Sequence, residues 1–238
     1  MSASPDQLDL LPDSALHRRT MVDCQIRTFD VTDQAVVARF LDVPREIFLP
    51  ARCRDLAYSD SALEITEGAA NGVWRQLLPP LVLARLIQGA SLRPEDKILD
   101  IAAGTGYSTA LLAGLCKDIT ALEADAGFAS LIEANLQACN VSNAHVVTGP
   151  LAQGFDKSAA YDVIFINGAV EAGLDTLFSQ LKDGGRLVAI QRFAGEANAH
   201  ASKAVRFEKG AHDVSSRFLF DASAALLKDF EKAPQFVF

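Results

Sequence analysis

Residues 97–113 constrain the fold of this chain more than any other stretch. Residues 98–101 form a short apolar run interrupted by one acid, which predicts a buried strand. Residues 108–113 predict a helix with an apolar face. Gly104 and Gly106 lie between them, and glycine permits a sharp turn close to a ligand because it has no Cβ. The stretch therefore predicts a strand, a tight turn and a helix of a Rossmann-like sheet.

A ligand is expected at the carboxyl end of this strand, where Rossmann-like sheets bind ligands and the next helix offers unpaired N–H groups. The pattern departs from the dinucleotide fingerprint, since Ser108 and Thr109 stand where its third glycine would come. It resembles the motif of class I S-adenosyl-L-methionine (SAM) methyltransferases, with an alanine replacing the first glycine. This resemblance implies SAM binding by Asp100, Ala102, Ala103, Gly104, Thr105, Gly106 and Tyr107. The alternative is a tight turn that binds no ligand.

A second acid is placed to hold the ribose of such a cofactor. Residues 120–123 predict the end of a second strand, and Glu123 lies 23 positions after Asp100. This is close to the roughly 20-residue spacing at which a carboxylate accepts hydrogen bonds from ribose hydroxyl groups. We therefore expect Asp100 to fix the turn around the methionine moiety and Glu123 to hold the ribose. The alternative for Glu123 is a solvated acid at the end of a strand.

The charge of the chain narrows the class of partner. The 238 residues carry a net charge of −8 with a sequence pI of about 5.0, and no run of Lys or Arg is longer than Arg18-Arg19. Binding along a nucleic-acid backbone needs a basic face. We therefore expect a protein, peptide or small molecule as partner and no nucleic acid. The sequence does not indicate the oligomeric state.

The cysteines and the apolar runs indicate a compartment. Cys24, Cys53, Cys116 and Cys139 lie far apart, without a C-x-x-C pair or a neighbouring histidine, so we expect reduced thiols and no metal site. No apolar run reaches membrane-spanning length, and the first residues, with acids among leucines, are unlike a signal peptide. These features predict a soluble cytoplasmic protein that does not bind membranes.

The first third of the chain predicts helices. A helix is expected from residue 13 or 14 to about residue 27. A second helix is expected to open at Thr32, whose hydroxyl group can cap it, and to end before Pro44. Residues 1–12 are polar and weakly patterned, so we expect them to be loose or draped on the surface.

Several segments together carry a resemblance to a known family. They are residues 21–26, 30–33, 43–50, 57–60, the SAM motif and residues 177–188. Their order and spacing resemble those of the protein-L-isoaspartate O-methyltransferases over roughly residues 18–190. The resemblance implies an α/β, Rossmann-like SAM-methyltransferase sheet, mostly parallel with an antiparallel edge, plus an N-terminal helical extension.

The pattern breaks near residues 66–72, and this break suggests two parts. Residues 1–70 are expected to be the helical extension with an acceptor-side segment. Residues 71–238 are expected to be the SAM-binding methyltransferase domain. The family resemblance implies methylation of a carboxylate on isoaspartyl residues, for protein repair.

The chain departs from this family at the acceptor segment. The family's Thr-Ile-Ser-Gln-Pro falls on residues 76–80, where Gln76 replaces the threonine and Leu78 the serine, and Trp74 and Arg75 stand for Gly-Gln. A carboxylate with a pKa near 4 is ionised at neutral pH, so the reaction needs no general base and a hydroxyl group there positions the acceptor. Leucine cannot donate that hydrogen bond. Gln76 is the candidate substitute, and Trp74 either lines the acceptor cleft or packs in the core.

Two further departures affect the cofactor side. After the third predicted strand, residues 144–148, the family's Gly-Asp-Gly becomes Gly149-Pro150-Leu151, and proline offers the adenine neither a carboxylate nor an N–H group. SAM affinity is then weaker, or Leu151 holds the adenine by hydrophobic contact. After the fourth strand, residues 161–166, Asn167 is either a turn residue or an amide beside the point of methyl transfer, as in some amino-group methyltransferases.

The end of the chain predicts an edge to the sheet. Residues 203–209 and 216–220 alternate between apolar and polar side chains, which favours two antiparallel strands. Residues 222–232 predict a helix with its apolar residues near one face.

Three functions remain open at this point. The leading one is SAM-dependent methylation of a carboxylate, with isoaspartyl residues as the acceptor. The second is the same fold acting on another acceptor, such as a small acid or an amino group. The third is a non-catalytic SAM-binding or interaction protein with a degenerate acceptor site.

Overall fold

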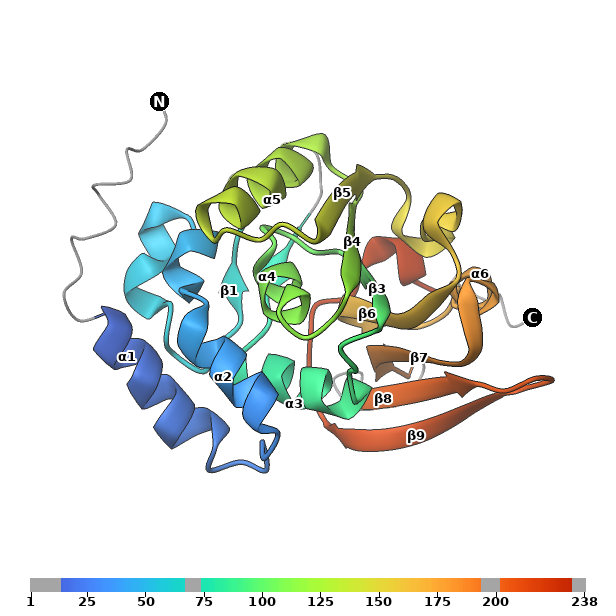
Figure 1. The fold of residues 1–238 in the computed structure, drawn as a ribbon, viewed down its shortest axis with the longest axis horizontal. Helices are drawn as coiled ribbons and strands as arrows, with labels where there is room; N and C mark the ends of the chain where they lie inside the picture. Colours follow the sequence, from blue (N-terminus) through green and yellow to red (C-terminus); the bar gives the residue numbers. More distant parts are fainter. Residues whose placement is uncertain (1–13, 67–73, 194–201, 233–238) are drawn as a thin grey trace, which may run out of the picture.

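The computed structural model describes residues 14–66, 74–193 and 202–232 (Figure 1). In these residues the α-helices are α1 (Ser14–Met21), α2 (Gln34–Asp42), α3 (Pro80–Ala90), α4 (Tyr107–Ala113), α5 (Ala126–Ala138) and α6 (Asp175–Ser179). A π-helical turn spans Val22–Ile26, and 3₁₀ turns span Arg45–Phe48, Ala51–Leu56, Leu151–Gln153, Asp156–Ser158 and Lys228–Phe230. The strands are β1 (Leu63–Glu64), β2 (Gln76–Leu77), β3 (Lys97–Ile101), β4 (Asp118–Glu123), β5 (Ala144–Thr148), β6 (Tyr161–Val170), β7 (Leu181–Arg192), β8 (Ser202–Lys209) and β9 (Val214–Asp221). Among the described helices, none is both long enough and apolar enough to cross a lipid bilayer.

Strands β3 to β9 form one sheet in the order β5-β4-β3-β6-β7-β8-β9 (Figure 1). The strands from β5 to β7 pair in parallel, and β8 and β9 add an antiparallel edge. The predicted sheet is confirmed. The chain runs outward from β3 to β5 and then returns to β6 beside β3. Ligands of such sheets bind at the carboxyl ends of the strands where the order reverses, so the expected site lies at the ends of β3, β4 and β6.

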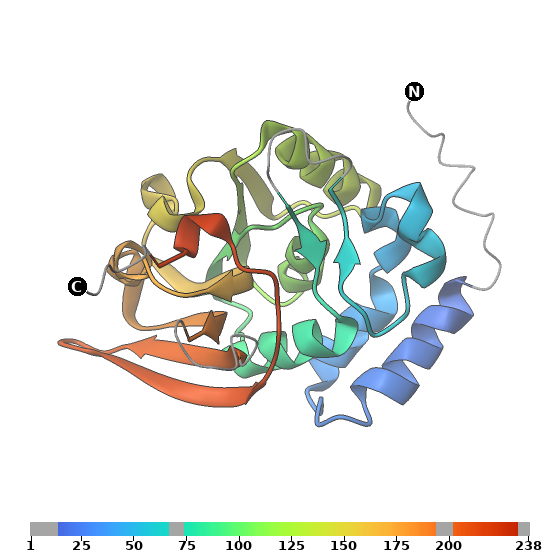
Figure 2. The ribbon, with the colours of Figure 1, turned by 180° about the vertical axis from the view of Figure 1, so that it is seen from behind.

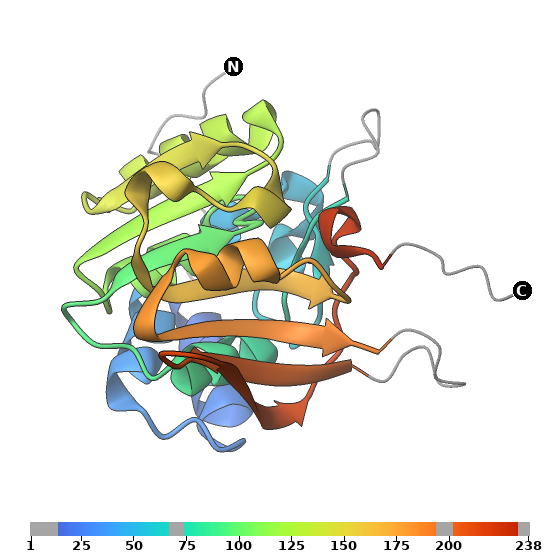
Figure 3. The ribbon, with the colours of Figure 1, turned by 90° about the vertical axis from the view of Figure 1, so that its right-hand side faces the viewer.

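Alternate side chains of the strands enter two hydrophobic cores, one on each face of the sheet. Along β6, Val163 and Phe165 enter the first core, whereas Ile164 and Ile166 enter the second. The first core is packed by α2, α3, α4 and α5, and the second by α6 and the last described residues. Figure 3 shows α6 and the N-terminal helices on opposite faces.

The N-terminal extension shares the first core with the sheet. Met21, Val22 and Ile26 lie in the same cluster as the strand residues Ile98 and Ile119. The helix predicted from residue 14 is confirmed as α1 together with the π-helical turn that follows it. Figure 2 shows the hairpin of β1 and β2 beside this extension. The proposed boundary near residues 66–72 falls almost wholly on residues 67–73, and the prediction for residues 1–12 also lies outside the described residues.

The second helix begins differently from the prediction. Thr32 does not cap it, because the Asp33 carboxylate accepts hydrogen bonds from the N–H groups of Ala35 and Val36. The N–H of Thr32 donates instead to Oε1 of Gln88 in α3, at 2.8 Å. A carboxylate also interacts more favourably with the positive end of the helix than a hydroxyl group does.

The helix predicted for residues 222–232 is wrong. The chain there is irregular, apart from the 3₁₀ turn at Lys228–Phe230 and a single bridge from Leu226 to Ala169 of β6. The N–H of Ala169 donates to the Ala225 carbonyl, and the N–H of Leu227 donates to the Ala169 carbonyl. Leu227, which is 3% exposed, packs against Gly168. Pairing with a strand and burial of Leu227 and Phe230 therefore outweigh the local helix propensity.

Gly168 is the position on which this docking depends. A Cβ atom there would lie 2.7 Å from Leu227 Cγ. We expect Gly168→Ala to lower the free energy of unfolding by about 1–3 kcal/mol, because overpacking forces side chains to shift. Gly149→Ala is the matched control, since its Cβ would meet Leu122 Cδ1 at an ordinary 3.6 Å. Urea unfolding of both variants measures the difference, and equal stabilities would contradict the proposed docking.

Candidate functional site

The carboxyl ends of β3, β4 and β6 bring the predicted site residues together. β3 pairs with β4 on one side and with β6 on the other. Asp100 lies in β3, Glu123 is the last residue of β4, and Asn167 lies in β6. Asp100 and Glu123 are both fully buried, so the alternative of a solvated acid at position 123 is wrong.

The loop after β3 has the backbone that the glycines predicted. Gly104 and Gly106 have φ angles of 62° and 92°, the left-handed region that glycine enters without a steric penalty. Ala102, which replaces the first glycine of the motif, also has a positive φ, of 56°. This conformation costs a non-glycine residue roughly 1–2 kcal/mol, so the fold enforces it. A Cβ on Gly104 would lie 2.7 Å from Ile65 Cδ1, which shows how closely the hairpin of β1 and β2 covers the loop.

Asp100 is held by three side-chain donors. The hydroxyl groups of Ser108 and Thr109, in the first turn of α4, donate to its Oδ2 at 2.8 and 2.7 Å. The Asn167 amide donates to its Oδ1 at 2.6 Å. Burial nevertheless raises the pKa of Asp100 to about 6, with the nearby Glu123 carboxylate adding to the increase and the three donors opposing it. Asp100 therefore fixes the start of α4 and the loop before it.

Asn167 does not follow the end of its strand, because β6 continues to Val170. Its amide nitrogen donates both to Asp100 Oδ1 and to the Ile101 carbonyl, at 2.6 and 3.1 Å. It is therefore not a turn residue, and its amide hydrogens hold β3. A part for Asn167 in methyl transfer stays a prediction.

Glu123 accepts four hydrogen bonds. The N–H groups of Gly104 and Ala124 donate to Oε1 and Oε2, at 2.8 and 3.0 Å. Arg75 donates through Nε to Oε1 at 3.1 Å and through Nη2 to Oε2 at 3.2 Å. Such a bidentate, charge-assisted pair is among the stronger hydrogen-bonding arrangements in proteins.

Sequence reasoning missed Arg75 as a partner of Glu123. Arg75 directly precedes β2, and its backbone N–H donates to the Thr66 hydroxyl group at 2.8 Å. Its side chain, 7% exposed, crosses from the hairpin to the end of β4. The only signal in the sequence was a cation where the family has a glutamine.

Three other predicted cofactor residues make contacts within the fold. Thr105 ties the loop to the N-terminal extension, because its hydroxyl group donates to the Phe48 carbonyl at 2.7 Å. The Tyr107 ring packs against Phe48, with ring centroids 5.4 Å apart, so this side chain belongs to the first core. Leu151 is fully buried in the second core together with Ala102, beside the loop. Their contact with a cofactor stays a prediction.

The acceptor segment lies next to the pair of Arg75 and Glu123. Gln76 is in β2, paired with Glu64 of β1. Leu78 is buried, and its carbonyl accepts a hydrogen bond from Nη2 of Arg45 at 2.9 Å. Trp74 is 44% exposed, so it is not a core residue and remains a candidate for lining the acceptor cleft.

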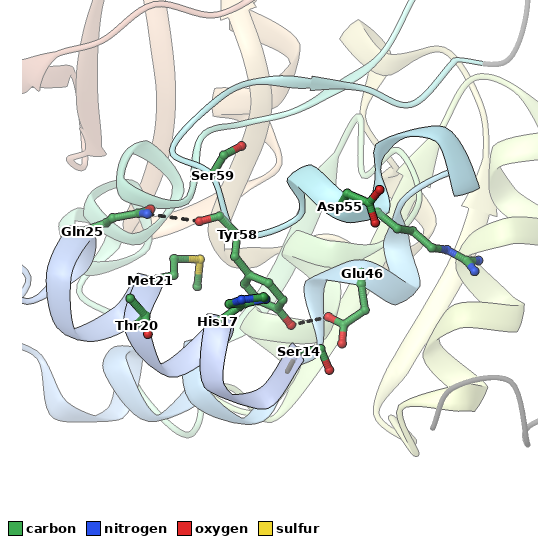
Figure 4. Close-up of a pocket in the computed structure, with 10 residues that line it drawn as sticks. Ser14, His17, Thr20, Met21, Gln25, Glu46, Asp55, Tyr58 and Ser59 are labelled. Atoms are coloured by element: carbon green, nitrogen blue, oxygen red, sulfur yellow. Dashed lines mark hydrogen bonds between the residues drawn. The ribbon is translucent and has the colours of Figure 1, made fainter. Parts of the chain in front are cut away.

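A separate cavity of about 370 Å³ lies between α1 and the two 3₁₀ turns of the extension (Figure 4). In it the Tyr58 hydroxyl group donates a short hydrogen bond to Glu46 and accepts one from Arg18 at 3.3 Å. Burial and the bond to Glu46 raise the pKa of Tyr58. The described residues that line this cavity include none of those predicted to bind SAM. In the described part of the chain, no three His, Cys, Asp or Glu side chains gather as a metal site.

Comparison with known proteins gives one consistent result. The family model described as protein-L-isoaspartate(D-aspartate) O-methyltransferase (PCMT) matches residues 17–213. A protein-L-isoaspartate O-methyltransferase of Koribacter versatilis (strain Ellin345) is 36% identical over 188 residues, which cover 79% of this chain and 80% of that protein. The enzyme of the same name from Herpetosiphon aurantiacus is 36% identical over 172 residues, which cover 72% of this chain and 74% of that protein.

Two solved structures share the fold. One protein-L-isoaspartate O-methyltransferase aligns with a TM-score of 0.77 and 21% identity, covering 88% of this chain and 65% of that one. A Plasmodium falciparum protein described as such a methyltransferase, solved in complex with S-adenosyl-L-homocysteine, aligns with a TM-score of 0.72 and 17% identity. That alignment covers 90% of this chain and 98% of the other.

The raised pKa of Asp100 predicts a dependence of stability on pH. Because the folded state binds this proton more tightly than the unfolded state, ionisation between pH 3.8 and about 6 lowers stability as the pH rises. The loss reaches about 3 kcal/mol above pH 6. Asp100→Asn cannot ionise at this position, so its stability relative to the parent should rise by about 2 kcal/mol between pH 4 and pH 7, since part of the loss already occurs below pH 4. Urea unfolding at several pH values measures it, and a difference independent of pH would contradict the assignment.

Proposed function

Because this chain belongs to the protein-L-isoaspartate(D-aspartate) O-methyltransferase family, we propose that it methylates a carboxylate with S-adenosyl-L-methionine, with isoaspartyl residues of proteins or peptides as acceptors. The observation that carries the proposal is the pair of buried acids at the carboxyl ends of adjacent strands. They flank a loop whose positive φ angles suit a closely approaching ligand. The product would serve protein repair.

The residues present fit this cofactor. The two carboxylate oxygens of Glu123 would accept from the ribose hydroxyl groups once the Arg75 guanidinium leaves them, and Asp100 fixes the loop that would surround the methionine moiety. Leu151, buried beside the loop, supplies an apolar surface for the adenine. Pro150 supplies no N–H group there, so the adenine would be held by packing against Leu151, or the affinity for the cofactor would be weaker.

The reaction requires the protein to align the acceptor with the methyl group rather than to transfer a proton. When bound, S-adenosyl-L-methionine supplies an electrophilic methyl group on a positively charged sulfur. A carboxylate acceptor, ionised at neutral pH, attacks without a general base. The task of the protein is to hold the acceptor in line and to exclude water. The hairpin of β1 and β2 supports this proposal, because Ile65 covers Gly104 and Gln76 begins the acceptor segment.

The division of the chain follows the same logic. We propose residues 71–238 as the SAM-binding methyltransferase domain and residues 1–70 as an extension that builds the acceptor side. The hydrogen bond between Thr105 and the Phe48 carbonyl supports this, since it joins the extension to the cofactor loop. We also propose a cytoplasmic location, supported by the four cysteines, which form no disulfide. The net charge of −8 supports protein or peptide acceptors over nucleic acids.

One observation favours a second candidate function. Leu78 is buried where the family has a serine, and no hydroxyl group replaces it at that position. The same fold acting on another acceptor, such as a small acid or an amino group, is therefore the alternative.

Methyl transfer from labelled S-adenosyl-L-methionine to an isoaspartyl peptide, beside its normal aspartyl twin, tests the acceptor. We expect transfer to the isoaspartyl peptide alone. Tight binding of the cofactor without transfer to either peptide would point to another acceptor. Binding without transfer to small acids, amino groups or other proteins would instead favour a non-catalytic SAM-binding protein.

The acceptor segment makes a separate prediction. Replacing Gln76 with Thr and Leu78 with Ser should lower KM for the isoaspartyl peptide by about tenfold, because a hydrogen bond to a charged group contributes about 1.5–3 kcal/mol. Steady-state kinetics on parent and variant measure it. High activity in the parent, unchanged in the variant, would show that these two positions do not hold the acceptor.

The ribose assignment predicts a loss of cofactor affinity in Glu123→Gln. We expect binding about a hundredfold weaker, because two hydrogen bonds to a charged acceptor are replaced by weaker ones. Titration calorimetry with S-adenosyl-L-homocysteine measures the change. A variant that is folded and binds as tightly as the parent would refute the assignment.

A further inference from the structure

The Glu123 carboxylate already has as many donors as it can accept. Its two oxygens receive one backbone N–H each, from Gly104 and Ala124, and one nitrogen each from Arg75. An ionised carboxylate offers about four lone-pair sites. All four are used, so another pair of donors can bind Glu123 only by replacing a pair that is present.

The two donors that can be replaced are those of the Arg75 side chain. The N–H groups of Gly104 and Ala124 belong to the cofactor loop and to the strand end, which the sheet fixes. Arg75 reaches the carboxylate from the hairpin of β1 and β2, a different element. The two hydroxyl groups of a ribose and the two N–H groups of a guanidinium engage a carboxylate in the same two-pronged manner. Arg75 and a ribose therefore compete for Glu123.

Only the side chain of Arg75 is free to leave. Its backbone N–H donates to the Thr66 hydroxyl group at 2.8 Å, and its carbonyl accepts from the Ile65 N–H at 3.0 Å. The guanidinium therefore stays near the hairpin after it leaves Glu123. An unpaired buried charge is strongly unfavourable, so the displaced guanidinium requires another anion within reach.

The carboxylate of the methyl acceptor is an anion that would bind next to Arg75. Arg75 directly precedes residues 76–80, the acceptor segment of the family, where Leu78 has no hydroxyl group to donate. A guanidinium offers two N–H groups in the geometry that a carboxylate binds best. Arg75 is therefore able to replace the donor that Leu78 lacks.

On the premise of the proposed function, we propose that Arg75 closes the ribose site of Glu123 and, once the cofactor displaces it, binds the carboxylate of the methyl acceptor. One side chain then links the two sites. The acceptor site is complete only after the ribose site is filled, which orders binding with the cofactor first.

Titration calorimetry on the full chain tests the competition. Arg75→Gln should bind both adenosine, which has the ribose but no carboxylate, and S-adenosyl-L-homocysteine about tenfold more tightly than the parent. Arg75→Lys should show a smaller gain, since a single ammonium replaces the two-pronged pair. In a Glu123→Gln background, Arg75→Gln should produce a smaller gain, because the charged two-pronged pair that holds Arg75 is already lost.

Kinetics with the isoaspartyl peptide at saturating S-adenosyl-L-methionine test the second role. Arg75→Gln should raise KM for the peptide by about tenfold with kcat within about twofold of the parent, the pattern of a lost binding contact. Arg75→Lys should restore part of the affinity. Arg186→Gln is the matched control: Arg186 forms a buried pair with Asp96, which precedes β3 at the opposite end of the sheet. It should lower thermal stability and leave adenosine affinity unchanged.

Four results would overturn the proposal. Adenosine affinity that is unchanged or weaker in the folded Arg75 variants would exclude competition. A gain for adenosine but not for S-adenosyl-L-homocysteine would place the displaced guanidinium on the carboxylate of the cofactor itself rather than on the acceptor. Failure of both variants to fold would make the pair a fixed structural element. Absence of cofactor binding and of methyl transfer in the parent would reject the proposed function, and this inference with it.

Discussion

Two buried carboxylates at the ends of neighbouring strands set the arrangement of everything around them. A buried charge is unfavourable unless hydrogen bonds surround it. Asp100 therefore fixes the first turn of α4 and the middle of β6, and Glu123 fixes the cofactor loop and Arg75. The elements that surround the expected cofactor are held in register because each supplies a donor to one of these acids. The positive φ of Ala102 persists within this network.

The same network draws the N-terminal extension into the site. The Phe48 carbonyl accepts from Thr105, and the Arg45 guanidinium lies 4.9 Å from the centre of the Tyr107 ring. Arg45 also donates to the Leu78 carbonyl, so it contacts both the start of α4 and the acceptor segment. The extension and the sheet share one hydrophobic core. Packed contacts therefore connect the acceptor segment and the cofactor loop to the same core.

The elements that were predicted correctly are those whose signal is local. The strand, loop and helix of residues 97–113 follow from the short-range hydrophobic pattern and from glycine, and Glu123 lies at the end of the next strand, as predicted. The wrong predictions concern segments whose conformation depends on contacts with residues far away in the sequence. Leu227 leaves a helical pattern because it packs against Gly168. The N–H of Thr32 donates a hydrogen bond to the side chain of Gln88, 56 positions away, and the neighbouring Asp33 caps the helix.

The sequence by itself determined the family, the sheet with its antiparallel edge, and the two acids of the expected cofactor site. These depend on residue type and spacing along the chain, which the sequence contains directly. Only the tertiary structure decided that Arg75 pairs with Glu123, that Asn167 lies inside β6 holding Asp100, and that the Tyr107 ring belongs to the core. The reason is physical: Arg75 and Glu123 are 48 positions apart, and no local pattern specifies which buried charge a side chain from another element will meet.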